Sequence, residues 1–205
     1  MPRPRTIPDE ALLDGALAVM RRAGPEGATF AAVAAETGLS PATLVQRFGS
    51  KAALMQAALL RAWDLLDART AAADAEAPPT AAGAVALLVA LSGDYGDGDA
   101  YAEGLLVLRE DLRDQALRRR GAAWGETLAM ALGRRLADAE GPRPDLGRLM
   151  AAQWQGAVLW WGFERGRPLR QAVAAELEAW CRAVIAPTDA EPDRMGRSRP
   201  LTRNR

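Results

Sequence analysis

Apolar residues recur at helical spacing along most of the chain, between short segments rich in glycine, proline and aspartate. In residues 8–22 they fall three or four positions apart, as on one face of an amphipathic helix. Two glycines and a proline in residues 23–27 interrupt this pattern. The later segments of helical period are 30–36, 41–47, 51–73, 82–91, 100–114, 115–139, 145–165 and 168–186. The pattern therefore predicts about nine helices.

Three of these helices follow a residue whose hydroxyl oxygen can accept a hydrogen bond from a free backbone N–H. Thr29, Ser40 and Ser50 each stand directly before a segment of helical period. Pro41 occupies the first helical position after Ser40, where the missing N–H of proline costs nothing. These residues predict helix starts at positions 30, 41 and 51.

Composition supports an all-α fold. The 45 alanines and 27 leucines make up about a third of the 205 residues, whereas valine and isoleucine together number 11. Alanine and leucine lose little conformational entropy in a helix, and β-branched residues lose more.

The rare residue types exclude several classes of site. The chain has no histidine and one cysteine, which excludes Ser-His-Asp and Cys-His catalysis, His-ligated metals, an intrachain disulfide and Cys₄ metal sites. Without a paired-acid signature, we expect no enzyme activity, no cofactor and no metal. The 26 basic and 26 acidic residues balance, which argues against a globally basic nucleic-acid coat protein but permits a local basic patch.

Membrane insertion and secretion are not expected. No apolar run reaches the roughly 18 residues of a membrane-spanning helix. The N-terminal residues 1–8 are followed by the acidic pair Asp9 and Glu10 rather than by the apolar segment of a signal peptide. We therefore expect a cytoplasmic protein.

Residues 30–48, FAAVAAETGLSPATLVQRF, fit the helix-turn-helix template. Val33 and Leu44 are apolar at the positions that pack two short helices together, as is Leu39. Ala34 is small where the helices approach, and Gly38 stands where the turn needs a positive φ. The alternative is an ordinary hairpin of two helices that ends its first helix with a glycine.

Residues 6–60 resemble the DNA-binding domain of TetR-type transcriptional regulators. The resemblance rests on the first amphipathic helix, on GPEGATF, and on VAAETGLSPATLVQRFGSKAALM. It implies a helix-turn-helix domain in residues 1–50 and a helical ligand-binding and dimerisation domain in residues 51–186. Residues 187–205 are rich in proline, arginine and aspartate, and we expect them to be disordered. Val45 departs from the tyrosine that is usual in the family, Ala42 from a frequent glycine, and Arg47 from a common histidine.

The resemblance assigns the helix that begins after Ser40 to the major groove of DNA. Gln46 is suited to adenine and Arg47 to guanine, whereas Val45 offers only a methyl contact to thymine. Thr29 adds a hydroxyl at a helix N-terminus, which attracts phosphate. Lys51 places a cation in a first helical turn, where it opposes the helix dipole and so suggests an anionic partner. The predicted DNA-binding residues are Thr29, Ser40, Pro41, Ala42, Thr43, Val45, Gln46, Arg47 and Lys51. The alternative is that they are plain exposed surface.

The last two predicted helices suggest a dimer interface. Residues 168–186 carry one apolar stripe, and residues 145–165 are apolar on nearly all sides, so they need cover on more than one side. The resemblance implies a four-helix bundle between two chains; the alternative is a helix buried within a monomer. The predicted interface residues are Trp161, Leu169, Val173, Leu177, Trp180 and Val184.

Six tryptophans, against three phenylalanines and two tyrosines, suggest a pocket for an apolar ligand. The predicted ligand-binding residues are Tyr101, Arg109, Trp124, Gln153, Trp154 and Trp160. The alternative is that the tryptophans fill the core and the interface.

Together these features predict a homodimeric repressor that binds a palindromic operator in double-stranded DNA and leaves it when a small apolar or amphipathic effector binds. The alternative is a TetR-like helical protein that binds a ligand or a partner without sequence-specific DNA binding.

Overall fold

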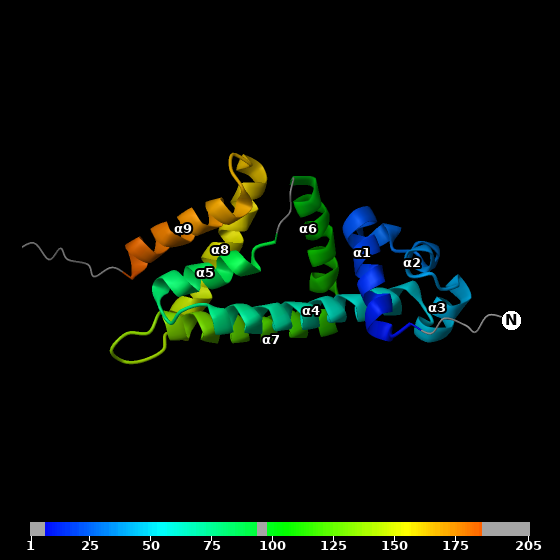
Figure 1. Cartoon of the computed structure of the whole chain (residues 1–205), viewed down its shortest axis with the longest axis horizontal. Helices are drawn as coiled ribbons and strands as arrows, with labels where there is room; N and C mark the ends of the chain where they lie inside the picture. The colour runs from blue at the N-terminus through cyan, green and yellow to red at the C-terminus, as the bar shows by residue number, and fades with distance from the viewer. Residues whose placement is uncertain (1–6, 94–97, 186–205) are drawn as a thin grey trace, which may run out of the picture.

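The computed structural model describes residues 7–93 and 98–185. Within them the chain forms nine α-helices and no strand, apart from one isolated β-bridge between Asp138 and Gly141 (Figure 1). The expected all-α class is confirmed, whereas the expected disordered tail lies outside the described residues. The helices are α1 Asp9–Gly27, α2 Phe30–Thr37, α3 Pro41–Phe48, α4 Lys51–Glu76, α5 Ala81–Leu91, α6 Gly98–Arg113, α7 Gln115–Arg135, α8 Pro144–Glu164 and α9 Leu169–Val184.

The long helix α4 runs along the molecule beside α7. Figure 1 shows α1, α2 and α3 at one end of α4 and α5, α8 and α9 at the other, with α6 standing between the two groups. Twenty-six residues give α4 a length of about 39 Å, so it spans both groups.

The predicted helix starts are confirmed by their caps. The side chains of Thr29, Ser40 and Ser50 accept hydrogen bonds from the N–H groups of the residues three positions later, each at 3.1 Å. A further cap is made by Asp114, whose carboxylate accepts from the N–H groups of Ala116 and Leu117 at 2.7 and 3.0 Å and so starts α7.

The predicted interruption near residue 24 is a kink within α1. Gly24 has φ 68° and ψ 172°, outside the helical region, and Pro25 then begins one more turn that ends at Gly27. A side chain at Gly24 would be strained by the positive φ, and its Cβ would lie 3.0 Å from a carboxylate oxygen of Glu103 in α6. The kink therefore sits where α1 meets α6.

Two groups of buried apolar residues form the interior. The first core consists of Leu12, Ala16, Val19, Met20, Ala28, Val33, Ala34, Leu44, Leu54, Ala58, Leu59 and Leu117. The second core consists of Ala73, Ala84, Val85, Leu87, Leu88, Leu91, Trp124, Leu128, Ala131, Leu132, Leu136, Met150, Trp154, Ala157, Val158, Trp161, Leu169, Ala172, Val173 and Leu177. Trp63, midway along α4, is half-buried and packs against both.

Helix α7 ends at Arg135, four residues before the end that its periodicity predicts. The reason is the turn that follows. The carboxylate of Asp138 accepts the N–H of Glu140 at 2.9 Å, and Asp138 and Gly141 exchange two backbone hydrogen bonds. A short acidic side chain that bonds the backbone locally favours a turn over a further helical turn.

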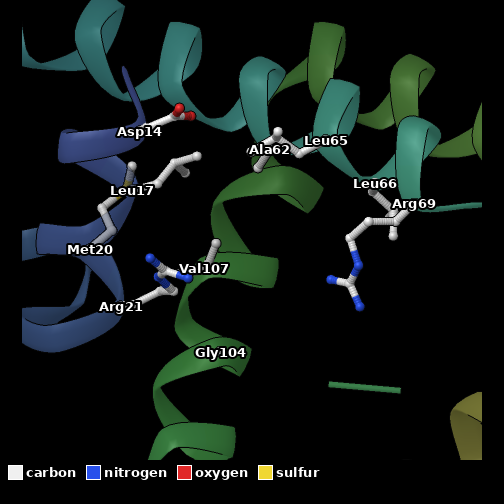
Figure 2. Close-up of a pocket in the computed structure, with 10 residues that line it drawn as sticks. All are labelled: Asp14, Leu17, Met20, Arg21, Ala62, Leu65, Leu66, Arg69, Gly104 and Val107. Atoms are coloured by element: carbon white, nitrogen blue, oxygen red, sulfur yellow. The ribbon is translucent and has the colours of Figure 1, made fainter. Parts of the chain in front are cut away.

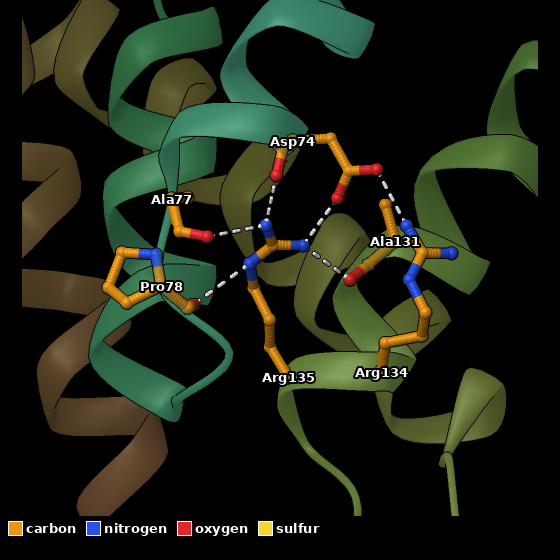
Figure 3. A network of polar contacts seen from close by, with 6 residues as sticks. All are labelled: Asp74, Ala77, Pro78, Ala131, Arg134 and Arg135. Carbon is orange, nitrogen blue, oxygen red and sulfur yellow. Dashed lines mark hydrogen bonds and ion pairs between the residues drawn. The ribbon is translucent and has the colours of Figure 1, made fainter.

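A buried arginine joins the C-terminal ends of α4 and α7. The side chain of Arg135 is 5% exposed, and its guanidinium donates to the Asp74 carboxylate at 2.5 Å and to the carbonyl oxygens of Asp74, Ala77, Pro78 and Ala131 (Figure 3). The carbonyls of Asp74 and Ala77 lie at the end of α4, where intrahelical donors are lacking, and that of Pro78 lies in the connection to α5. Arg135 therefore fixes the connection between α4 and α5 to α7.

Candidate functional site

The turn between α2 and α3 has the geometry that its sequence predicts. Gly38 ends α2 in the left-handed conformation with φ 72°, and its N–H bonds the carbonyl of Ala34 at 2.9 Å. Val33, Ala34 and Leu44 are buried in the first core, so the two short helices pack through the residues that the motif assigns to this contact. Residues 30–48 therefore form a helix-turn-helix.

Helix α3 presents most of its surface outward. Leu44 is its one fully buried residue, whereas Pro41, Ala42 and Gln46 are exposed and Val45 is 46% exposed. The outer residues belong to successive turns of one helix. This arrangement gives α3 an exposed face of small, apolar and amide side chains.

Ser40 and Thr43 are already bonded to each other. The Ser40 hydroxyl accepts the Thr43 N–H, and the two hydroxyl oxygens lie 2.9 Å apart. Thr29 in the same way accepts the N–H of Ala32 while remaining exposed. The Thr29 and Ser40 oxygens cap their helices. In the Ser40–Thr43 pair one hydroxyl donates to the other, so the accepting hydroxyl keeps its O–H for an outside acceptor.

Arg47, the predicted reader of guanine, is held within the chain. Its guanidinium donates to the Asp9 carboxylate at 3.0 Å and to the Ile7 carbonyl at 3.2 Å. These contacts tie the end of α3 to the start of α1. A base contact by Arg47 therefore requires this pairing to be exchanged for the base.

Lys51 also has an acceptor in the chain. Its ammonium donates to the Glu26 carbonyl at 2.8 Å and lies 3.5 Å from the Glu26 carboxylate. The Glu26 carbonyl belongs to the last turn of α1, where helix carbonyls lack partners and favour a cation. An internal partner therefore accounts for a lysine in the first turn of α4, without an outside anion.

The predicted ligand-binding residues do not gather around one cavity. Trp124 and Trp154 are packed in the second core, and their indole N–H groups donate to Thr70 and Ser92, each at 3.0 Å. Tyr101 packs edge-on against Trp161 with ring centroids 6.0 Å apart and lines a pocket between α6 and α8. Gln153 and Trp160 line a separate hollow between α8 and α9, and Arg109 is exposed beside Glu110.

The apolar stripe predicted as a dimer interface is largely covered by the chain itself. Trp161, Leu169, Val173 and Leu177 belong to the second core, where α9 packs against α5 and α8. Trp180 is half-buried and Val184 is exposed. A partner therefore cannot reach most of this stripe.

Several large apolar side chains on the last two helices are exposed. Trp160 is 64% exposed and Phe163 is 75% exposed, and their rings lie 5.7 Å apart on α8. Leu149, Leu159 and Val184 are exposed as well. We call the exposed large apolar side chains of α8 and α9 the open apolar face: Leu149, Leu159, Trp160, Phe163 and Val184. The all-round apolar pattern of residues 145–165 was the signal that could have located it.

Electrostatics at the junction of α4 and α6 centre on Asp111. Its carboxylate accepts the indole N–H of Trp63 at 3.1 Å. Burial raises the pKa of Asp111, and the bond from Trp63 acts in the opposite direction. Nearby, Gln56 donates to Asp114 at 2.7 Å, so two polar contacts fix the C-terminal end of α6 to α4.

Among the described helices, none has both the length and the apolar character needed to cross a membrane.

Comparison with known proteins identifies the N-terminal segment. Residues 12–58, which run from α1 into α4, match the family model described as bacterial regulatory proteins, tetR family. This confirms the resemblance for that segment. No curated protein matches the sequence.

Solved structures share the fold over most of the chain. A putative transcriptional regulator from Pseudomonas aeruginosa PAO1 is 24% identical, with a TM-score of 0.65 over 89% of this chain and 94% of that one. A putative TetR-family transcriptional regulator from Mesorhizobium loti MAFF303099 is 19% identical, with a TM-score of 0.57 over 85% and 95%. The multidrug binding protein EbrR, solved with imidazole, is 23% identical, with a TM-score of 0.59 over 85% and 95%. The chain thus has the fold that these transcriptional regulators and EbrR share.

Proposed function

We propose, from the tetR-family match of residues 12–58 and the TetR-like fold, that this protein is a homodimeric transcriptional repressor. It binds a palindromic operator in double-stranded DNA and is released by a small apolar or amphipathic effector. The observation that carries the proposal is the outward face of α3, which is exposed although the helix is fixed to the core by Leu44. Such a regulator acts in the cytoplasm, where the DNA is.

The exposed face of α3 is suited to the major groove. Gln46 can pair with adenine through its amide, and Val45 can contact a thymine methyl. Thr29 caps α2 and Lys51 begins α4, and we propose that both contact phosphates beside the groove. Phosphate contacts hold the helix in register, and base contacts select the sequence.

Dimerisation is proposed through the open apolar face. Large exposed apolar patches on a globular chain commonly mark an interaction surface, and a two-fold axis lets the same patch cover its copy. A dimer would present two α3 helices to half-sites about 34 Å apart or a multiple of that distance. The division into a DNA-binding domain of residues 1–50 and a ligand-binding and dimerisation domain of residues 51–186 is part of this proposal.

Effector release requires two dimer states in which the α3 helices are differently separated. Helix α4 is suited to couple them, since it begins beside the DNA-binding residues and its far end is held to α7 by Arg135. An effector that prefers the state with the wrong separation lowers operator affinity.

One observation favours the alternative function without sequence-specific DNA binding. Arg47 and Lys51, the two cations that the motif offers to DNA, are both paired within the chain. Val45 also lacks the hydroxyl of the family's usual tyrosine. A protein that kept the fold but lost DNA binding would carry these features.

Selection of genomic DNA fragments by the purified protein separates the two functions. A repressor enriches a fragment on which footprinting reveals two protected half-sites, and its affinity falls steeply with salt. The double variant Val45→Ala/Gln46→Ala should lose the enrichment, whereas Arg119→Gln, an exposed control on α7, should keep it. A wild-type protein that enriches no sequence would support the alternative.

A further inference from the structure

A pocket lies where α1, α4 and α6 meet, apart from the predicted ligand-binding residues. Its volume is about 390 Å³, within the range of small-molecule sites. The walls are mainly apolar, with Leu17 and Met20 from α1, Leu65 and Leu66 from α4, and Val107 from α6 (Figure 2). Such a surface favours a hydrocarbon body, since burying apolar area is stabilising.

Two arginines line the same pocket. Figure 2 shows Arg21 reaching from α1 on one side and Arg69 from α4 on the other, with α6 between them. Neither guanidinium has a hydrogen-bond or ion-pair partner among the described residues. Asp14 also lines the pocket, but it is paired with Arg61 at 3.1 Å. The pocket therefore combines apolar walls with two uncompensated positive charges.

We propose that this pocket binds a small amphipathic carboxylate, with its hydrocarbon body against the leucines and its carboxylate at Arg21 or Arg69. A guanidinium presents parallel N–H groups that match the two oxygens of a carboxylate. The regulatory part of this inference, that such a ligand is the effector, rests on the proposed function; the binding itself does not.

The position of the pocket links its occupancy to the DNA-binding helices. Helix α6 is fixed to α4 at its C-terminal end by the Trp63–Asp111 and Gln56–Asp114 bonds. Gly104, farther from that end, lines the pocket opposite α1. A bound ligand therefore sets the spacing between α6 and α1, next to the kink at Gly24, and so the tilt of the unit that carries α3.

The test is calorimetric titration of the full-length protein, without DNA, using octanoate and 2-naphthoate as two carboxylates of different shape. The neutral 1-octanol and the cationic octylamine are matched controls. We expect one carboxylate per chain and at least tenfold weaker binding of the controls. Arg21→Gln and Arg69→Gln should together weaken carboxylate binding about tenfold or more, since a charge-assisted contact is lost. Arg119→Gln should leave it unchanged.

Three outcomes overturn the proposal: neither carboxylate binds, 1-octanol binds as tightly as octanoate, or the double variant binds octanoate like the wild type. Arginine-to-glutamine changes at exposed positions keep the fold, which a matching thermal unfolding curve checks. The regulatory part is tested separately on DNA, where octanoate should lower operator affinity by the factor by which the operator lowers octanoate affinity. If the protein binds no DNA, the proposed function fails while the titration still decides the pocket.

Discussion

Arg135 donates to both the carboxylate and the backbone carbonyl of Asp74, at 2.5 and 2.6 Å. The first contact pairs two charges, and the second caps the last turn of α4. One arginine side chain therefore both neutralises Asp74 and completes the helix that bears it.

Replacing Arg135 should lower the free energy of unfolding. Arg135→Met leaves the Asp74 charge and several carbonyl groups without their buried donor, and we expect the free energy of unfolding to fall by about 3 kcal/mol. Arg134→Lys is the matched control, because Arg134 also pairs with Asp74 but is half exposed, and should cost less than about 1 kcal/mol. Urea unfolding measures both; equal losses would contradict the role given to Arg135.

Changes on α3 should act on sequence preference. Gln46→Ala removes an exposed amide that supports no internal contact, so we expect a loss of about 1–3 kcal/mol of discrimination at one base pair and an unchanged melting temperature. Arg47→Ala should reduce both discrimination and stability, since it also frees Asp9. Competition binding with single-base operator variants measures discrimination. Unchanged preference in Gln46→Ala would remove Gln46 from the base-reading set.

Lys51 offers a choice between two roles. If it contacts phosphate, Lys51→Ala weakens binding to all sequences alike and flattens the salt slope by about one unit. If it serves only to hold the Glu26 carbonyl, the salt slope stays the same and the melting temperature falls. We expect Lys51→Ala to weaken binding to all sequences and to flatten the salt slope. Binding isotherms at several salt concentrations, together with melting curves, distinguish the two.

A charge on the open apolar face should prevent dimerisation, whereas a charge in the buried stripe of α9 should prevent folding. Phe163→Arg places a charge on an exposed surface, so we expect a folded protein that sediments as a monomer where the wild type is a dimer. Val173→Arg buries a charge in the second core and should yield unfolded or insoluble chains. Analytical ultracentrifugation and circular dichroism check both. A Phe163→Arg protein that remains dimeric would place the interface elsewhere.

Local sequence signals predicted the elements well, because caps and turns depend on residues a few positions apart. Thr29, Ser40, Ser50 and Gly38 each act within one helical turn, and the structure confirms their predicted roles as helix caps and turn residue. Periodicity also identified the buried stripe of α9. It does not say what covers a stripe, and here α5 and α8 of the same chain cover it.

The side-chain pairings between distant parts of the chain could not be predicted from the sequence. Arg47 bonds Asp9 across 38 positions and Lys51 bonds Glu26 across 25, and nothing in spacing or residue type singles out these partners. The pocket beside Arg21 and Arg69 likewise needs three helices, brought together by packing, before it exists.

Trp63 couples the unfolding of the two cores. Its ring packs against both cores, and Leu117, from α7, belongs to the first core. Neither core therefore keeps all its apolar contacts once the other has unfolded. The loss of one raises the free energy of the other, which joins the two transitions into one. Heat should therefore melt this chain as a single cooperative body, even though DNA and effector are proposed to act on different parts of it.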